Sequence, residues 1–89
     1  SFEDYSANEM LEILLALASQ NEYAVSADAL DELRQHFDKV YALRQKGFGN
    51  GRYVRTLFER MIELHSLRCT DDAAIDIATL RREDIPQDL

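Results

Sequence analysis

The chain has 89 residues, of which 46% are hydrophobic and 30% are charged, and its ten basic and seventeen acidic residues give a net charge of −7. This length and composition predict one small folded domain over residues 1–89 rather than a disordered segment. No apolar run approaches the roughly 20 residues that cross a bilayer, and the acidic balance disfavours non-specific nucleic-acid binding. We therefore expect neither a membrane nor a nucleic acid as a partner.

Two further features of the sequence bear on its origin. The single cysteine, Cys69, excludes an internal disulfide, and the acidic residues at 1–4 do not fit a secretory leader. Both favour a cytoplasmic protein. The absence of an initiator methionine suggests that the chain is a piece of a longer protein.

The first predicted helix starts at Ser6. Residues 6–9 match the capping box, in which the side chains of Ser6 and Glu9 each accept a hydrogen bond from the other residue's backbone N–H. A wide apolar face follows at helical spacing and ends near Gln20. Its members are Leu11, Leu14, Leu15, Leu17 and Ala18.

The second predicted helix starts at Ser26, a favoured N-cap residue, with Asp28 in the first turn where the helix dipole favours an acid. Its apolar stripe consists of Leu30, Leu33, Phe37, Val40 and Tyr41. We expect the helix to stop at Gly47, because glycine commonly ends helices and Arg44 and Lys46 suit the preceding turn.

The third predicted helix starts at Asn50, interpreted as its N-cap, and ends near residues 69–70. Its stripe consists of Val54, Leu57, Phe58, Met61, Leu64 and His65. Residues 74–80 alternate weakly and could pair with residues 2–5, whereas Arg82–Ile85 fit a last helical turn before Pro86. The predicted fold is mainly all-α: a small antiparallel bundle of three long helices, a short C-terminal turn and a minor two-stranded ribbon from the chain ends.

Positive charge collects in one part of the chain. Residues 44–60 hold five basic residues and one acid, a net charge of +4, whereas the rest of the chain has a net charge of −11. A glycine-rich turn with Gly49 and Gly51 leads directly into Arg52 and Arg55. Because cations in a first helical turn oppose the dipole by about 0.3–1 kcal/mol each, stability alone does not favour this order. The pattern predicts an anion site, most simply for a phosphate.

A structural explanation of the same residues stays open. The glycines fit a connection between two helices, and the arginines could be solvated or paired with Glu59. The three glycines do not fit a dinucleotide-binding fingerprint, since that motif follows a strand and a helix is predicted here.

The sequence contains few other motifs that could support catalysis. It contains neither a phosphate-binding loop of the Gly-x-x-x-x-Gly-Lys-Ser/Thr type nor an acid-terminated strand for magnesium, so we expect no ATP hydrolysis by these residues alone. We interpret His36 as a surface residue and His65 as a core-edge residue, and we predict no metal site. Cys69 is interpreted as a buried or helix-end thiol without a patterned base partner.

Residues 47–59 resemble the sensor-2 segment of AAA+ ATPase lid domains, particularly in the family of the red-type Rubisco activases, the stage V sporulation protein K ATPases and the type VII secretion ATPases. Residues 2–6 with 10–13, 23–30 and 80–86 resemble the start, the second helix and the closing segment of that lid. Arg81 stands where the family often has a capping Thr or Ser.

The resemblance implies that ATP lies between this lid and a large α/β domain of the same chain, which would also bind magnesium. Arg52 would contact the γ-phosphate, with Arg55 beside it, while Gly49, Asn50 and Gly51 would let the backbone approach adenine and ribose. The lid would also pack on the large domain of the neighbouring subunit in a hexamer. Such chaperone-like rings remodel a protein substrate.

Two functions from other classes remain as alternatives. A free-standing helical protein-interaction module would use its apolar faces to dock on a partner. A small nucleic-acid binder would place its third helix in a groove, but the charge of −11 outside the basic stretch argues against it.

Overall fold

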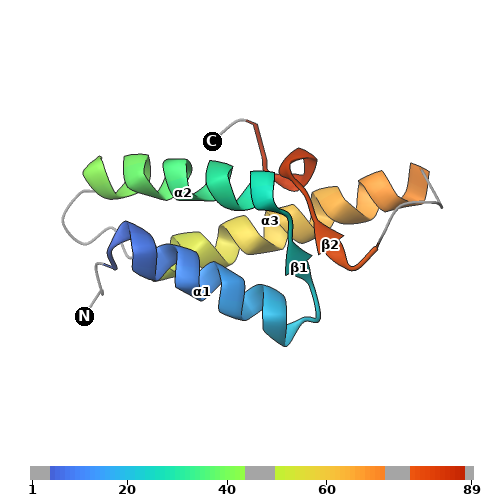
Figure 1. The fold of residues 1–89 in the computed structure, drawn as a ribbon, viewed down its shortest axis with the longest axis horizontal. Helices are drawn as coiled ribbons and strands as arrows, with labels where there is room; N and C mark the ends of the chain where they lie inside the picture. Colours follow the sequence, from blue (N-terminus) through green and yellow to red (C-terminus); the bar gives the residue numbers. More distant parts are fainter. Residues whose placement is uncertain (1–4, 44–49, 72–76, 88–89) are drawn as a thin grey trace.

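In the computed structural model, residues 5–43, 50–71 and 77–87 are described, and they confirm the predicted mainly helical fold (Figure 1). The three long helices are α1 (Ala7–Gln20), α2 (Ala27–Ala42) and α3 (Asn50–Asp71). Two short strands, β1 (Ala24–Val25) and β2 (Thr79–Leu80), and the 3-10 helix η1 (Arg82–Asp84) complete the described elements. Helix α2 is antiparallel to α3. In this view α1 lies below α3 and runs at an angle to it.

Helix α1 begins as its capping box predicts. The Ser6 N–H donates to Glu9 Oε1 over 2.9 Å, and the Glu9 N–H donates to Ser6 Oγ over 3.2 Å. The helix ends at Gln20, and the side-chain amide of its C-cap residue, Asn21, donates to the Leu17 carbonyl over 2.8 Å. Glu22 then adopts a positive φ of 64°, which turns the chain towards β1.

Helix α2 begins after its predicted N-cap but ends earlier than expected. The Ser26 side chain accepts from the Ala29 N–H, and the Asp28 carboxylate accepts from the same group over 2.8 Å. The helix ends at Ala42, with Leu43 as its C-cap, rather than at Gly47. Its apolar stripe stops at Tyr41, and Leu43 is 81% exposed, so the last described residue of this segment adds no burial to the helix.

Helix α3 confirms the predicted third helix over its full length, but the N-cap interpretation of Asn50 is wrong. Asn50 is the first residue of the helix and is completely buried. Its side chain bonds to the backbone of Tyr5 instead of capping α3.

The predicted small ribbon exists, although with a different partner. Strand β2 pairs in parallel with β1, through Ala24↔Thr79 and Val25↔Leu80, rather than with residues 2–5. The backbone of Tyr5 is not available for such pairing, since both its N–H and its carbonyl bond to Asn50.

The core lies between the three helices and is closed by the C-terminal segment. All three helices, β2 and the residue after η1 contribute side chains that are fully or almost fully buried; the largest hydrophobic ones are Met10, Leu14, Leu33, Phe37, Val54, Met61, Leu80 and Ile85. Complete burial of one such side chain contributes about 1.5–3 kcal/mol. Among the described residues, no helix combines the length and apolar character needed to cross a membrane.

Candidate functional site

Arg52 and Arg55 lie in the first turns of α3, at the end of the bundle where α1 begins and α2 ends (Figure 1). Both side chains are exposed, and the first turn of α3 contains no acid. Within residues 5–43, 50–71 and 77–87, neither guanidinium forms an ion pair or a hydrogen bond. The pair with Glu59 that would have neutralised Arg55 is therefore not formed in this part of the chain.

Asn50 and Gly51 lie directly beside the arginines and hold Tyr5. The Tyr5 N–H donates to Asn50 Oδ1 over 2.9 Å, and Asn50 Nδ2 donates to the Tyr5 carbonyl over 2.6 Å. A Cβ atom on Gly51 would lie 3.0 Å from Cε2 of the Tyr5 ring. The structure thus brings four of the five predicted site residues together, while Gly49 lies outside the described residues.

His36 and Tyr53 connect α2 to α3 next to Arg52. The imidazole Nε2 and the phenol hydroxyl share a hydrogen bond, with the ring centroids 5.8 Å apart. Burial lowers the pKa of His36, with Lys39 adding to the effect and Glu32 opposing it. Burial also raises the pKa of Tyr53. Both groups are therefore neutral at pH 7, and His36 is a half-buried link between helices rather than the surface residue expected.

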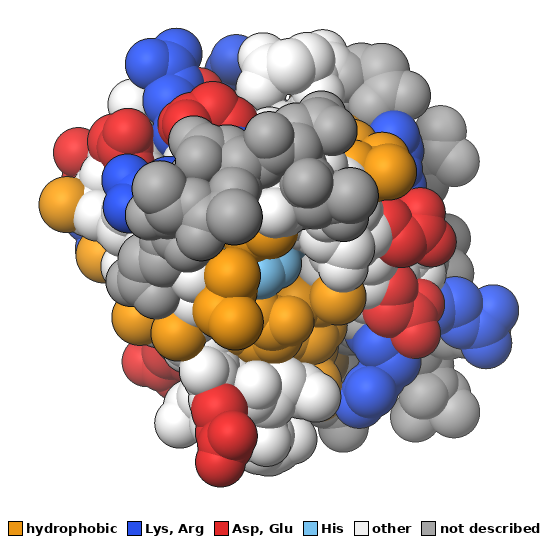
Figure 2. All heavy atoms as spheres, turned by 90° about the vertical axis from the view of Figure 1, so that its right-hand side faces the viewer, with side chains coloured by type: hydrophobic (Ala, Val, Ile, Leu, Met, Phe, Trp, Pro, Cys, Tyr) orange, Lys and Arg blue, Asp and Glu red, His pale blue; other side chains and the backbone are white. Residues whose placement is uncertain are grey.

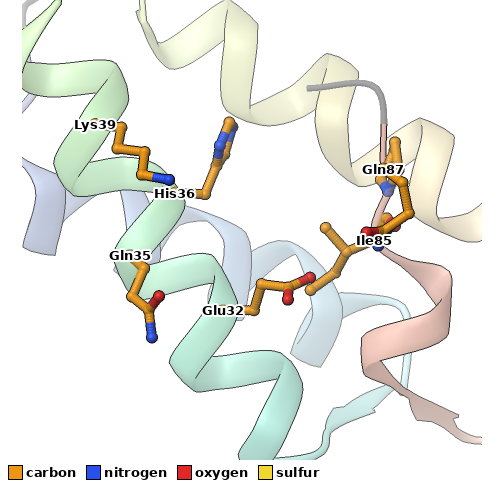
Figure 3. Close-up of a pocket in the computed structure, with 7 residues that line it drawn as sticks. Glu32, Gln35, His36, Lys39, Ile85 and Gln87 are labelled. Carbon is orange, nitrogen blue, oxygen red and sulfur yellow. Dashed lines mark hydrogen bonds between the residues drawn. The ribbon is translucent and has the colours of Figure 1, made fainter.

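A hollow of about 230 Å³ lies between α2 and the C-terminal segment (Figure 3). Its lining residues are Glu32, Gln35, His36, Lys39, Ile85, Pro86 and Gln87. The Glu32 and Ile85 side chains point towards each other across it (Figure 3). The charges of Glu32 and Lys39 offset each other here, so this hollow has no net positive charge that would favour an anion.

An ion pair that the sequence did not reveal joins α3 to the C-terminal segment. Arg68 donates from Nε to Asp84 Oδ1 and from Nη2 to Oδ2, each over 2.8 Å. Asp84 is fully buried and also accepts from the Arg81 N–H over 2.8 Å. Burial alone would raise the pKa of Asp84, but the hydrogen bonds from Arg68 and the Arg81 N–H outweigh it, and the pKa is lowered. Nothing in the spacing between Arg68 and Asp84 along the sequence signalled the pair.

At the end of the bundle opposite to Arg52 and Arg55, hydrophobic side chains gather around a histidine (Figure 2). His65 is 4% exposed, packs edge-on against Tyr23 and has its Nε2 3.5 Å from Cys69 Sγ. The interpretation that Cys69 lacks a base partner is therefore wrong; the signal was the four-residue spacing, which puts both side chains on one helix face. Tyr23, His65, Ser66, Cys69 and Ile77 line a hollow of about 330 Å³. In the described ranges, no group of three or more His, Cys, Asp or Glu side chains could hold a metal ion.

Comparison with known proteins agrees with this arrangement. A family model described as the AAA lid domain matches residues 6–89. Stage V sporulation protein K of Bacillus subtilis (strain 168) is 28% identical over 88 residues, which cover 94% of this chain and 27% of that protein. No solved structure gives a significant match. The chain is a member of the AAA lid domain family.

Proposed function

We propose that this chain is the lid of an AAA+ ATPase and that Arg52 senses bound ATP. The observation that supports it most strongly is the pair of exposed arginines at the start of α3, which have no partner among the described residues. Guanidinium groups at a helix N-terminus, next to a glycine-rich stretch of sequence, provide the donors and the positive charge that a phosphate requires. Membership of the AAA lid family and the likeness to a sporulation ATPase supply the context.

In the proposed mechanism, residues 1–89 form a piece of a longer ATPase whose large α/β domain holds magnesium and most of the nucleotide. The backbone at Gly49, Asn50 and Gly51 approaches adenine and ribose, and Arg52 binds the γ-phosphate. Hydrolysis removes this contact, and the lid then moves relative to the large domains of its own and the neighbouring subunit. In a hexameric ring, this movement drives the remodelling of a protein substrate.

We propose different roles for the neighbouring residues. Both polar atoms of the Asn50 side chain bond to Tyr5, whereas the guanidinium groups of Arg52 and Arg55 have no partner within the described chain and are available to a ligand. Arg55 lies three residues after Arg52, on the same side of the helix, and we propose that it adds positive charge without touching the γ-phosphate.

The test is ATP turnover by the full-length protein that contains this lid. Because a hydrogen bond to a charged group contributes about 1.5–3 kcal/mol, Arg52→Ala should lower turnover by about 10- to 100-fold. Arg34→Ala removes an equally charged, exposed arginine from α2 and serves as the matched control, with turnover close to wild type. Equal turnover in the two variants would remove Arg52 from the site, and it is also the result that a free-standing interaction module predicts.

A further inference from the structure

We propose that Asn50 is a positioning residue, which joins the first turn of α3 to the segment before α1 so that Arg52 and Tyr5 move as one unit. This inference rests on the proposed role of Arg52. It follows from an arrangement that nucleotide binding by itself does not require: the residue two positions before Arg52 directs its side chain to a segment 45 residues away in the sequence.

We call this connection between Asn50 and Tyr5 the joint. Both polar atoms of the buried Asn50 side chain form hydrogen bonds to the backbone of Tyr5. Asn50 has no exposed surface, and its Oδ1 and Nδ2 atoms bond to the N–H and carbonyl of Tyr5 over 2.9 and 2.6 Å. Asparagine suits this task because it presents one donor side and one acceptor side at short reach, whereas ionised aspartate only accepts. Buried polar groups are costly to leave unpaired, so the two bonds resist separation of the segments.

Gly51 contributes to the joint through the ring of Tyr5 rather than through its backbone. The Tyr5 ring lies where a Cβ on Gly51 would be 3.0 Å from Cε2, so the ring packs against the backbone of α3. Asn50 therefore fixes the Tyr5 main chain and Gly51 accommodates its ring, and Arg52 follows directly. Tyr5 in turn precedes the capping box that starts α1.

This arrangement gives a direct route from the nucleotide to the rest of the ATPase. A shift of Arg52 when the γ-phosphate leaves would pull on Tyr5 through the two hydrogen bonds. In the proposed ATPase, the segment before α1 leads to the large domain, so the same joint would transmit the shift to that domain. Asn50 would thus influence hydrolysis through Arg52 and Tyr5 without touching the nucleotide.

A double-mutant cycle in the full-length ATPase tests this coupling. Asn50→Ala should lower ATP turnover by about tenfold, as expected for a misplaced contact group, with the KM for ATP changed less than kcat. In the Arg52→Ala background, the same substitution should change turnover by less than about twofold, because the group that it positions is already absent. Ser26→Ala, which loosens the start of α2 instead, should leave turnover close to wild type.

A second, independent test adds a side chain at residue 51 and removes the aromatic ring at residue 5. Gly51→Ala should displace the Tyr5 ring and speed the hydrogen exchange of the residue-5 amide, whereas Gly51→Ala combined with Tyr5→Ala should restore slow exchange, because the bonds to Asn50 use only the backbone of residue 5. This pair also decides the question if Asn50→Ala proves unfolded in a thermal denaturation control. Failure of the double variant to recover slow exchange would then count against the joint.

The outcomes separate this inference from the proposed function. If Arg52→Ala lowers turnover while Asn50→Ala does not, or if the two effects multiply in full, the positioning role is wrong and the sensing role stands. If Arg52→Ala has no effect, the sensing role itself fails. A Tyr5 amide that exchanges with solvent as fast in the wild type as in Asn50→Ala would show that no joint forms.

Discussion

Arg52 and Arg68 show how differently two arginines of one helix are used. Arg68 is largely buried and forms a bidentate ion pair with Asp84, and this ion pair raises the pKa of Arg68. Arg52 is exposed and has no partner among the described residues. A buried pair of this kind holds segments together, and removal of one partner is costly. An unpaired cation at a helix start remains available for a ligand.

The Asp84 carboxyl should make stability depend on pH in the acid range. Its pKa lies below the ordinary value of 3.8 in the folded chain. As the pH falls through 3.8, the unfolded chain takes up a proton that the folded chain does not, so the stabilisation present above this pH is lost towards the lower folded pKa. Urea denaturation of the 89-residue chain between pH 7 and the acid range measures this loss.

Asp84→Asn should abolish this part of the acid sensitivity and lower the free energy of unfolding at pH 7 by about 3 kcal/mol, because Arg68 keeps its charge without a counter-charge. Glu83→Gln, a change at the exposed neighbouring acid, is the matched control and should leave both properties almost unchanged. The same acid slope in Asp84→Asn as in the wild type would show that another carboxyl is responsible.

At the scale of single elements, the sequence predicted those features that depend on residues close together in the chain. The helix starts at Ser6 and Ser26 were predictable because a cap depends only on residues within one turn. The partner of β2 and the role of Asn50 were not, since each depends on segments far apart in the sequence. Asn50 is a frequent N-cap residue type, but a buried bond to Tyr5 overrides that preference.

The capping box of α1 gives a test at this scale. Ser6→Ala removes the acceptor of the Glu9 N–H and should lower the free energy of unfolding by about 1 kcal/mol. Helix α1 packs against both other helices, so its loss affects the whole bundle. Ser19→Ala, at an exposed position late in the same helix, should be neutral or slightly stabilising, as alanine is the better helix former. Chemical denaturation compares the two, and equal stabilities would contradict the cap.

The whole molecule has two ends of opposite character. The end with the start of α3 carries the exposed arginines, and the far end of that helix carries the hollow around His65, where hydrophobic side chains gather (Figures 1 and 2). The basic end was predictable because its charge stands out against an acidic chain. The other end was not, because it assembles Tyr23, His65 and Ile77 from three separate segments.

The most direct test of the sensing role compares two nucleotides that differ only at the γ-phosphate position. Affinities for ADP and for a non-hydrolysable ATP analogue are measured by titration calorimetry on the full-length protein and on its Arg52→Ala and Arg55→Ala variants. Arg52→Ala should lose at least about tenfold in affinity for the ATP analogue and keep its affinity for ADP within about twofold. Unchanged affinities, or equal losses for both nucleotides, would contradict a γ-phosphate contact by Arg52, and a selective loss in Arg55→Ala alone would transfer that contact to Arg55.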